Sequence, residues 1–102
     1  MHFLAHFFTG AFLCNALPHL AAGLQGRSFP TPFARPRGIG HSTPLLNVFW
    51  GFFNLLAGLA LLTSYPAAVG ATPEFGAVCA GALLLGAYLA LHFGRLPKDA
   101  HQ

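Results

Sequence analysis

Charged residues are scarce in this chain. Aspartate and glutamate together number two, lysine and arginine together five, and charged residues make up 7% of the 102 positions, against about a quarter in an ordinary soluble domain. A small soluble protein needs a polar surface, because most of a small protein is surface. The scarcity of charge therefore excludes a conventional soluble domain, and the hydrophobic residues, 55% of the chain, are expected to face lipid.

Recognisable catalytic and redox motifs are also missing. The chain has two cysteines, Cys14 and Cys79, and they lie in separate apolar runs without the CxxC spacing of a redox or zinc motif. We find no internal repeat and no nucleotide-binding or protease motif. Whether the chain is an enzyme is therefore left open by the sequence.

Basic residues are few and lie outside the apolar runs. The formal net charge is +3, but the cations form no stripe along a helix of the kind that nucleic-acid-binding domains present. Short basic clusters beside apolar runs suit the head groups of anionic lipids instead. We therefore expect a lipid bilayer, and no nucleic acid, as partner. The cations are Arg27, Arg35, Arg37, Arg95 and Lys98.

Three long uncharged runs dominate what is present, at residues 3–24, 45–65 and 75–93. Each is close to the roughly 20 residues that a helix needs to cross the hydrocarbon of a bilayer, and none has a continuous polar face. The sequence therefore predicts an all-α integral membrane protein, in which residues 1–102 form a single domain of three transmembrane helices. The first run lacks the basic segment that precedes a signal peptide, so we expect a retained helix.

The placement of the cations predicts the orientation. Three arginines lie between the first and second helices, and Arg95 and Lys98 follow the third, whereas residues 64–74 contain no Lys or Arg. With three spans, the first loop and the C-terminal tail share one side, which the positive-inside rule makes cytoplasmic. We therefore expect a multi-pass protein of the inner (cytoplasmic) membrane with its N-terminus outside and its C-terminus inside.

The predicted cytoplasmic loop, residues 25–44, is rich in proline and glycine, and we expect neither helix nor strand in it. Phe29 and Phe33 interrupt its polar residues. A solvated linker has no need of them, so the loop should lie among the lipid head groups or fold back on the helix ends. Ser or Thr capping and Pro44 in the first turn predict that the second helix begins at Ser42-Thr43-Pro44.

Asparagine and histidine side chains interrupt the first two runs. Asn15 and His19 are four residues apart and so share a helix face. Asn15 and Asn54 each lie roughly 14 Å from the cytoplasmic end of their helix, at about 1.5 Å per residue, and His19 and Trp50 share a shallower depth. We therefore predict contacts between Asn15 and Asn54 and between His19 and Trp50. Polar residues and glycines of the second helix form one stripe: Asn47, Gly51, Asn54 and Gly58.

Small residues recur at every fourth position of the third helix, at Ala82, Gly86, Ala90 and Gly94. Such a stripe favours close approach of two helix backbones in a membrane. Three thin helices bury little surface between themselves, so small-residue stripes suggest more helix neighbours than one chain provides. A homo-oligomer or a larger membrane complex is therefore the expected protein partner.

His19 is the main candidate for a ligand-binding residue. A histidine inside a span binds metal or heme, or is satisfied by hydrogen bonds within the bundle, and both interpretations stay open. For heme b, Gly23 and Gly51 would make room for the flat ring and Trp50 would stack on it. The second axial ligand would be His92, or His19 of another protomer.

A second histidine pair lies near the start of the chain. His2 and His6 are four residues apart at the outer end of the first helix, beside the α-amino group, and this spacing suits a divalent metal ion. Two ligands make a weak site. Interfacial histidines that hold no metal are therefore the competing interpretation.

Three functions are compatible with these features. The first is a small oligomeric membrane protein that acts through helix–helix assembly, for example as an accessory subunit of a membrane complex. The second is a membrane-embedded heme or redox protein that uses His19. The third is a small transporter or channel lined by Asn15, Asn54 and His19, although the spans lack the acidic residue that proton- or cation-coupled carriers generally use.

Overall fold

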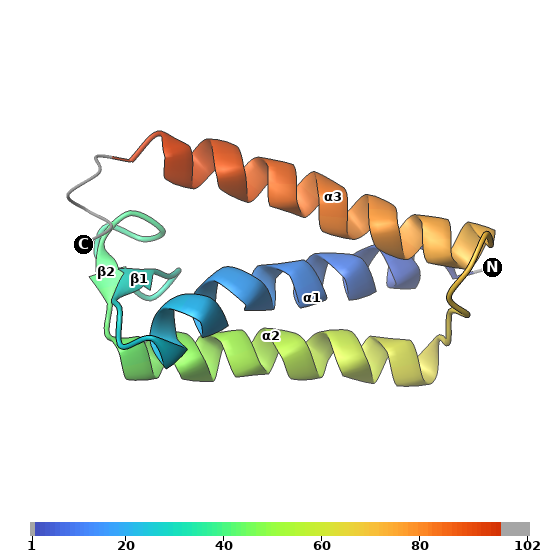
Figure 1. Ribbon diagram of the computed structural model, residues 1–102, viewed down its shortest axis with the longest axis horizontal. Coiled ribbons are helices and arrows are strands. Elements are labelled where there is room, and N and C mark those ends of the chain that lie inside the picture. Colours follow the sequence, from blue (N-terminus) through green and yellow to red (C-terminus); the bar gives the residue numbers. More distant parts are fainter. Residues whose placement is uncertain (1, 97–102) are drawn as a thin grey trace.

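The computed structural model describes residues 2–96, and the predictions that involve Lys98 lie outside these residues. Three helices account for most of the chain (Figure 1). All three are long and apolar enough to cross a membrane. The elements in order are α1 (Phe3–Leu24), β1 (Phe29–Pro30), β2 (His41–Ser42), α2 (Pro44–Ser64) and α3 (Pro73–Gly94).

The start of α2 agrees with the sequence-based prediction. The hydroxyl oxygen of Thr43 accepts a hydrogen bond from the backbone N–H of Leu46 at 3.2 Å, and Pro44 occupies the first turn. A proline fits there because the first backbone N–H groups of a helix have no intrahelical acceptor. The helix therefore begins at Pro44, one residue before the predicted apolar run.

The third helix begins earlier than its apolar run predicted. Thr72 caps it by accepting a hydrogen bond from the backbone N–H of Phe75 at 3.1 Å, and Pro73 lies in the first turn. Glu74 is charged, so the uncharged run was counted only from Phe75 onward. An acidic residue in the first turn is nevertheless favourable for a helix, because it faces the positive end of the helix dipole.

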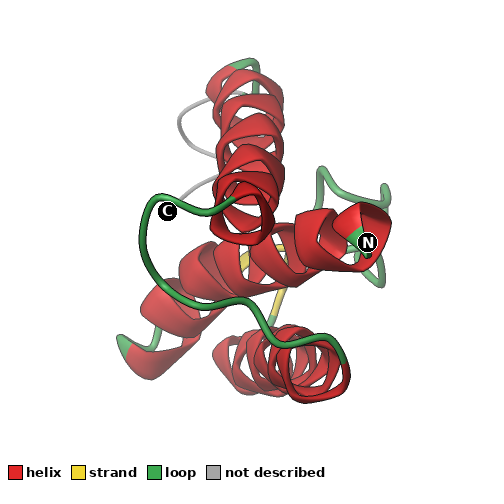
Figure 2. Cartoon of the chain, turned by 90° about the vertical axis from the view of Figure 1, so that its right-hand side faces the viewer, coloured by secondary structure: helices red, strands yellow, loops and turns green. Residues whose placement is uncertain are grey.

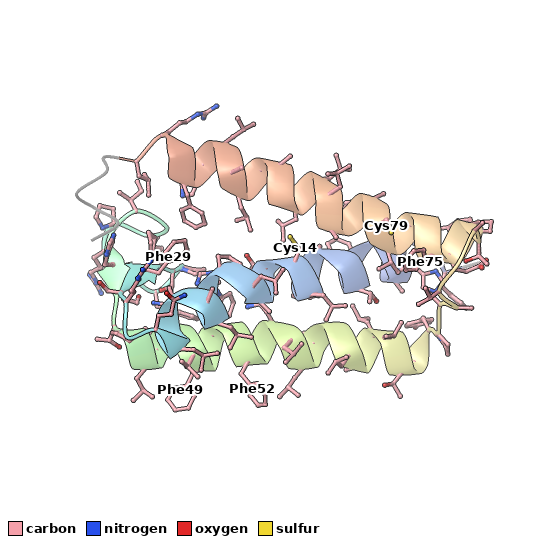
Figure 3. The ribbon with its side chains drawn as sticks, viewed as in Figure 1. Cys14, Phe29, Phe49, Phe52, Phe75 and Cys79 are labelled. Carbon is pink, nitrogen blue, oxygen red and sulfur yellow. The ribbon has the colours of Figure 1, made fainter. Side chains whose placement is uncertain are left out.

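Helix α1 lies between the other two helices (Figure 2). It packs extensively against both α2 and α3, whereas α2 and α3 make almost no contact with each other. Large apolar side chains cover the outside. Phe49 and Phe52, for example, point away from the bundle on the outer side of α2 (Figure 3) and are 63% and 50% exposed. An outer surface of this kind suits lipid rather than water.

The α1–α2 contact uses the stripe that the sequence predicted. The buried residues of α2 are Asn47, Gly51, Asn54 and Gly58. A Cβ atom on Gly51 would lie 2.7 Å from Cγ of Leu20, and one on Gly58 would lie 2.6 Å from Cδ2 of Leu13. The two glycines therefore give leucines of α1 room to pack directly on the backbone of α2.

The α1–α3 contact does not centre on the predicted small-residue stripe. A Cβ atom on Gly10 would overlap the carbonyl oxygen of Val78, and one on Gly81 would overlap that of Phe7. Gly81 is the buried residue of α3, whereas Ala90 and Gly94 of the predicted stripe are exposed. The helices approach closely at Gly10 and Gly81 and diverge toward the other end (Figure 1). The stripe extends into this diverging part.

The connection between α1 and α2 is a folded segment, and part of the prediction for it was wrong. A short antiparallel pairing joins Phe29 to Ser42 and Pro30 to His41. A hydrogen bond between the hydroxyl oxygens of Thr31 and Ser42, which lie 2.6 Å apart, joins the same two stretches. The expectation of neither helix nor strand failed because these side chains bring the two ends of the segment together. Hereafter "the loop" is residues 25–43, and "the loop end" is the end of the bundle where it lies.

The loop folds back on the helices, which is one of the two arrangements the sequence suggested. The ring of Phe29 lies 4.6 Å from that of Phe93 on α3 and 5.5 Å from that of His19 on α1, centroid to centroid. Phe33 meets Trp50 of α2 edge to face at 5.1 Å. The two phenylalanines therefore attach the loop to all three helices.

Candidate functional site

A cavity of about 340 Å³ lies at the loop end, lined by all three helices and the loop. Its walls consist mainly of aromatic and aliphatic side chains. None of the lining residues in the described part of the chain is charged. The lining residues that carry polar side-chain atoms are Asn15, His19, Thr31, Trp50, Asn54, Tyr88 and His92. A largely apolar hollow with a few convergent polar groups is typical of sites for small molecules.

Asn47 holds His19 at the cavity wall. The amide nitrogen of Asn47 donates to three backbone carbonyl oxygens, those of Phe29 at 3.1 Å, Ser42 at 3.2 Å and Thr43 at 3.1 Å. Its amide oxygen lies 2.8 Å from Nδ1 of His19. Both side chains are buried, with 0% and 3% of their surface exposed. Asn47 therefore connects α1, the loop and the start of α2.

These bonds determine which nitrogen of His19 carries the proton. The NH₂ group of Asn47 has to face the three carbonyls, so its oxygen faces His19, and Nδ1–H of His19 is the donor. In the neutral ring the other nitrogen, Nε2, is then a hydrogen-bond acceptor. Nε2 has no hydrogen-bond partner within residues 2–96. His19 lines the cavity, and Nε2 is the ring nitrogen that Asn47 leaves available.

The predicted asparagine pair is present. Nδ2 of Asn15 donates to Oδ1 of Asn54 at 2.9 Å, and Nδ2 of Asn54 donates to the backbone carbonyl of Trp50 at 2.8 Å. Asn54 is 1% exposed. The pair thus connects α1 to α2 along one wall of the cavity, and the equal depths of the two residues predicted it correctly.

Trp50 contributes a second unpartnered polar atom. Its ring lies 6.4 Å from that of His19 in an edge-to-face arrangement, which confirms the predicted contact. Its indole Nε1 is buried and makes no hydrogen bond to the part of the chain that the structure describes. Buried donors are nearly always satisfied in folded proteins. Two polar atoms on neighbouring side chains, an acceptor and a donor, therefore remain without partners.

The remaining residues of the heme prediction make other contacts in the structure. Nε2 of His92 is 2.7 Å from the backbone oxygen of Gly38 and donates to it, so this nitrogen is already in use. Gly23 and Gly51 are at the α1–α2 contact. A Cβ atom on Gly23 would lie 2.7 Å from Cγ2 of Val48. The structure brings His92, Trp50 and His19 to one cavity, but the two glycines make room for side chains of the bundle.

The N-terminal histidine pair takes part in packing. Nε2 of His6 lies 3.1 Å from the carbonyl oxygen of Tyr65 and 3.3 Å from that of Pro66. The ring of His2 is 4.6 Å from that of Tyr65. Among residues 2–96 no group of three or more His, Cys, Asp or Glu is placed to hold a metal ion. The pair fastens the start of α1 to the α2–α3 connection.

Several residues of the cavity were missed from the sequence. They are Phe8, Ala11 and Phe12 of α1, the loop residues Pro30, Thr31, Pro32 and Gly38, and Leu85, Tyr88, Leu89 and Phe93 of α3. Extending the face of Asn15 and His19 backward by helical spacing finds Phe12 and Phe8. The loop and α3 residues gave no such signal, because their place depends on where α3 diverges from α1.

Fold and site together define a class: a protein of three apolar helices with an uncharged cavity among them, lined by His19 and by aromatic and aliphatic side chains. Comparison of the chain with protein-family models, curated proteins and solved structures gave no match. The functional argument therefore starts from the cavity itself.

Proposed function

We propose that this chain is a multi-pass membrane protein that binds a small lipid-soluble molecule in the cavity between its helices. The observation that carries the proposal is His19 at the wall of a mainly apolar cavity: Nδ1 is committed to Asn47, and Nε2 has no hydrogen-bond partner among the described residues. An unsatisfied buried polar group costs about 1–3 kcal/mol. A ligand that donates a hydrogen bond to Nε2 of His19 supplies the partner that this acceptor lacks.

Two further features favour a ligand that comes from the lipid. The cavity lining within the described residues carries no charge, so a neutral molecule suits it. Helices α2 and α3 hardly contact each other, yet both line the cavity. A molecule dissolved in the hydrocarbon can therefore enter between them without crossing the polar surface.

Filling the cavity with a larger side chain tests this function. Ala11 lines the cavity, and Ala11→Phe should reduce the amount of specifically bound small molecule at least about tenfold, the ratio that 1.4 kcal/mol gives. Ala60 is exposed on α2, so Ala60→Phe is the matched control and should leave binding unchanged. The measurement is native mass spectrometry of the purified protein, followed by solvent extraction of what it carries.

The proposal fails if the wild-type protein carries nothing enriched over the bulk lipid, or if Ala11→Phe retains as much as Ala60→Phe. A visible absorption spectrum of the same preparations tests the heme alternative, because bound heme gives a Soret band. The channel alternative requires Asn15, Asn54 and His19 to line a pore. Asn15 donates to Asn54, and Asn54 donates to the backbone, so these hydrogen-bonding groups are already committed within the bundle.

We further propose that this is a protein of the inner membrane whose loop end faces the cytoplasm. Arg27, Arg35 and Arg37 are in the loop, and Arg95 follows α3 at the same end. In a chain without native cysteines, a cysteine at position 69 should react with a membrane-impermeant maleimide in intact cells. A cysteine at position 37 should react only after permeabilisation. The reverse pattern would mean that the orientation is inverted.

Assembly into a homo-oligomer or a larger complex is the second candidate function. One observation favours it: α3 buries little beyond Gly81, and its outer surface is rich in small residues, which allow close helix packing in membranes. The exposed small residues are Gly76, Ala80, Ala87, Ala90 and Gly94. The native mass spectra count the protomers directly, and a monomer that carries a ligand would support the first function alone.

A further inference from the structure

The hydrogen bonds around His19 restrict what the cavity can accept. Nδ1–H is committed to Asn47, and Asn47 cannot turn its amide over without placing its oxygen against the carbonyls of Phe29, Ser42 and Thr43. Nε2 of a neutral His19 therefore offers a lone pair and no proton. A quinone, an ester or an ether has only acceptor oxygens and cannot bond to this nitrogen.

The indole of Trp50 lies beside His19. Its Nε1–H is a donor only, and it is buried without a partner in the described chain. A hydroxyl group donates a proton and so suits Nε2 of His19, whereas Nε1 of Trp50 is too deeply buried to meet a ligand in the cavity. An ammonium group would also donate, but no carboxylate of the described residues lines the cavity to balance its charge.

The shape and walls of the cavity favour a ring over a simple chain alcohol. Phe12, Trp50, Tyr88 and Phe93 line it, and aromatic walls pack well against a flat ring. Its volume of about 340 Å³ lies at the lower end of the range for small-molecule sites. A ring of modest size is accommodated, and a hydrocarbon tail would leave between α2 and α3, which hardly contact each other.

From these contacts, and resting on the proposed function, we propose that the cavity binds the head group of a quinol-type lipid. In this arrangement a ring hydroxyl of the lipid donates a hydrogen bond to Nε2 of His19. The oxidised quinone and the O-methylated ring lack the donated proton, so they bind more weakly. His19 thus selects the hydroxylated form of the ring.

The experiment compares two probes that differ only at the hydroxyls: a decyl-substituted hydroquinone and its di-O-methyl ether. Each is titrated into the full-length protein in lipid nanodiscs, with the fluorescence of Trp50, the single tryptophan of the chain, as readout. The hydroquinone should bind about tenfold more tightly than the ether, as expected for one buried hydrogen bond. In His19→Phe the two affinities should become equal. His2→Phe, at the opposite end of α1, is the control and should keep the preference.

Each outcome decides between the claims. Equal, saturable binding of the two probes to the wild-type protein would overturn the quinol inference and leave the proposed function standing. Absence of saturable binding for either probe, together with no enriched molecule in the native spectra, would overturn both. Nitrogen NMR of histidine-labelled wild-type protein adds a test that does not depend on the folding of any variant: His19 should carry its proton on Nδ1, and a proton on Nε2 would overturn the inference.

Discussion

Asn47→Leu should lower the free energy of unfolding by about 3 kcal/mol. The change leaves Nδ1–H of His19 and the carbonyl oxygens of Phe29 and Ser42 without the bonds that Asn47 now makes. Thr43 still accepts from the backbone N–H at position 47. Each buried group that loses its partner costs about 1–3 kcal/mol. The lower end of that range applies, because hydrogen bonds in membrane proteins are on average weak.

Asn54→Leu is the matched control for this prediction. It removes an asparagine of equal burial on the same stripe of α2, but that side chain makes only the bonds to Asn15 and to the backbone of Trp50. The expected loss is about 1 kcal/mol. Unfolding by SDS in mixed micelles, followed by circular dichroism, measures both variants. If Asn47→Leu is no more destabilising than Asn54→Leu, Asn47 does not have the connecting role assigned to it.

Gly81→Ala should separate α3 from α1, with a loss of about 2–3 kcal/mol. The added Cβ atom would overlap the carbonyl oxygen of Phe7. A side chain in the way can change its rotamer, but this neighbour is helix backbone and can move only with the whole helix. Because α3 makes almost no contact with α2, only its contacts with the loop, at Phe93 and His92, remain among the described residues to hold it once α1 and α3 move apart.

Two glycines of the same helix provide the comparison for Gly81→Ala. A Cβ atom on Gly76 or Gly94 would meet nothing within 4 Å. Alanine at Gly76 should be neutral or stabilising by up to about 1 kcal/mol, because alanine favours helix more than glycine does. The same SDS unfolding measures these variants. Equal effects at Gly76 and Gly81 would show that close packing at Gly81 does not hold α3 on α1.

The sequence by itself determined the features that depend on neighbouring residues. The uncharged runs predicted the three helices, and Thr43 with Pro44 predicted the start of α2, because capping involves groups within one turn. Helical spacing put Asn47, Gly51, Asn54 and Gly58 on one stripe. Depth along the helix paired Asn15 with Asn54, since rise per residue is the same in every helix.

Only the tertiary structure decided the partners that lie far apart in the chain. Depth along the helix placed His19 beside Trp50. It did not show that Asn47 would bond to His19, because the side chain of Asn47 is held by a loop that folds back on the helices. Spacing found a small-residue stripe on α3, yet the crossing of α1 and α3 made Gly81 the point of contact. The cavity follows from that crossing, because α3 diverges from α1 beyond Gly81 and leaves space that no local pattern in the sequence encodes.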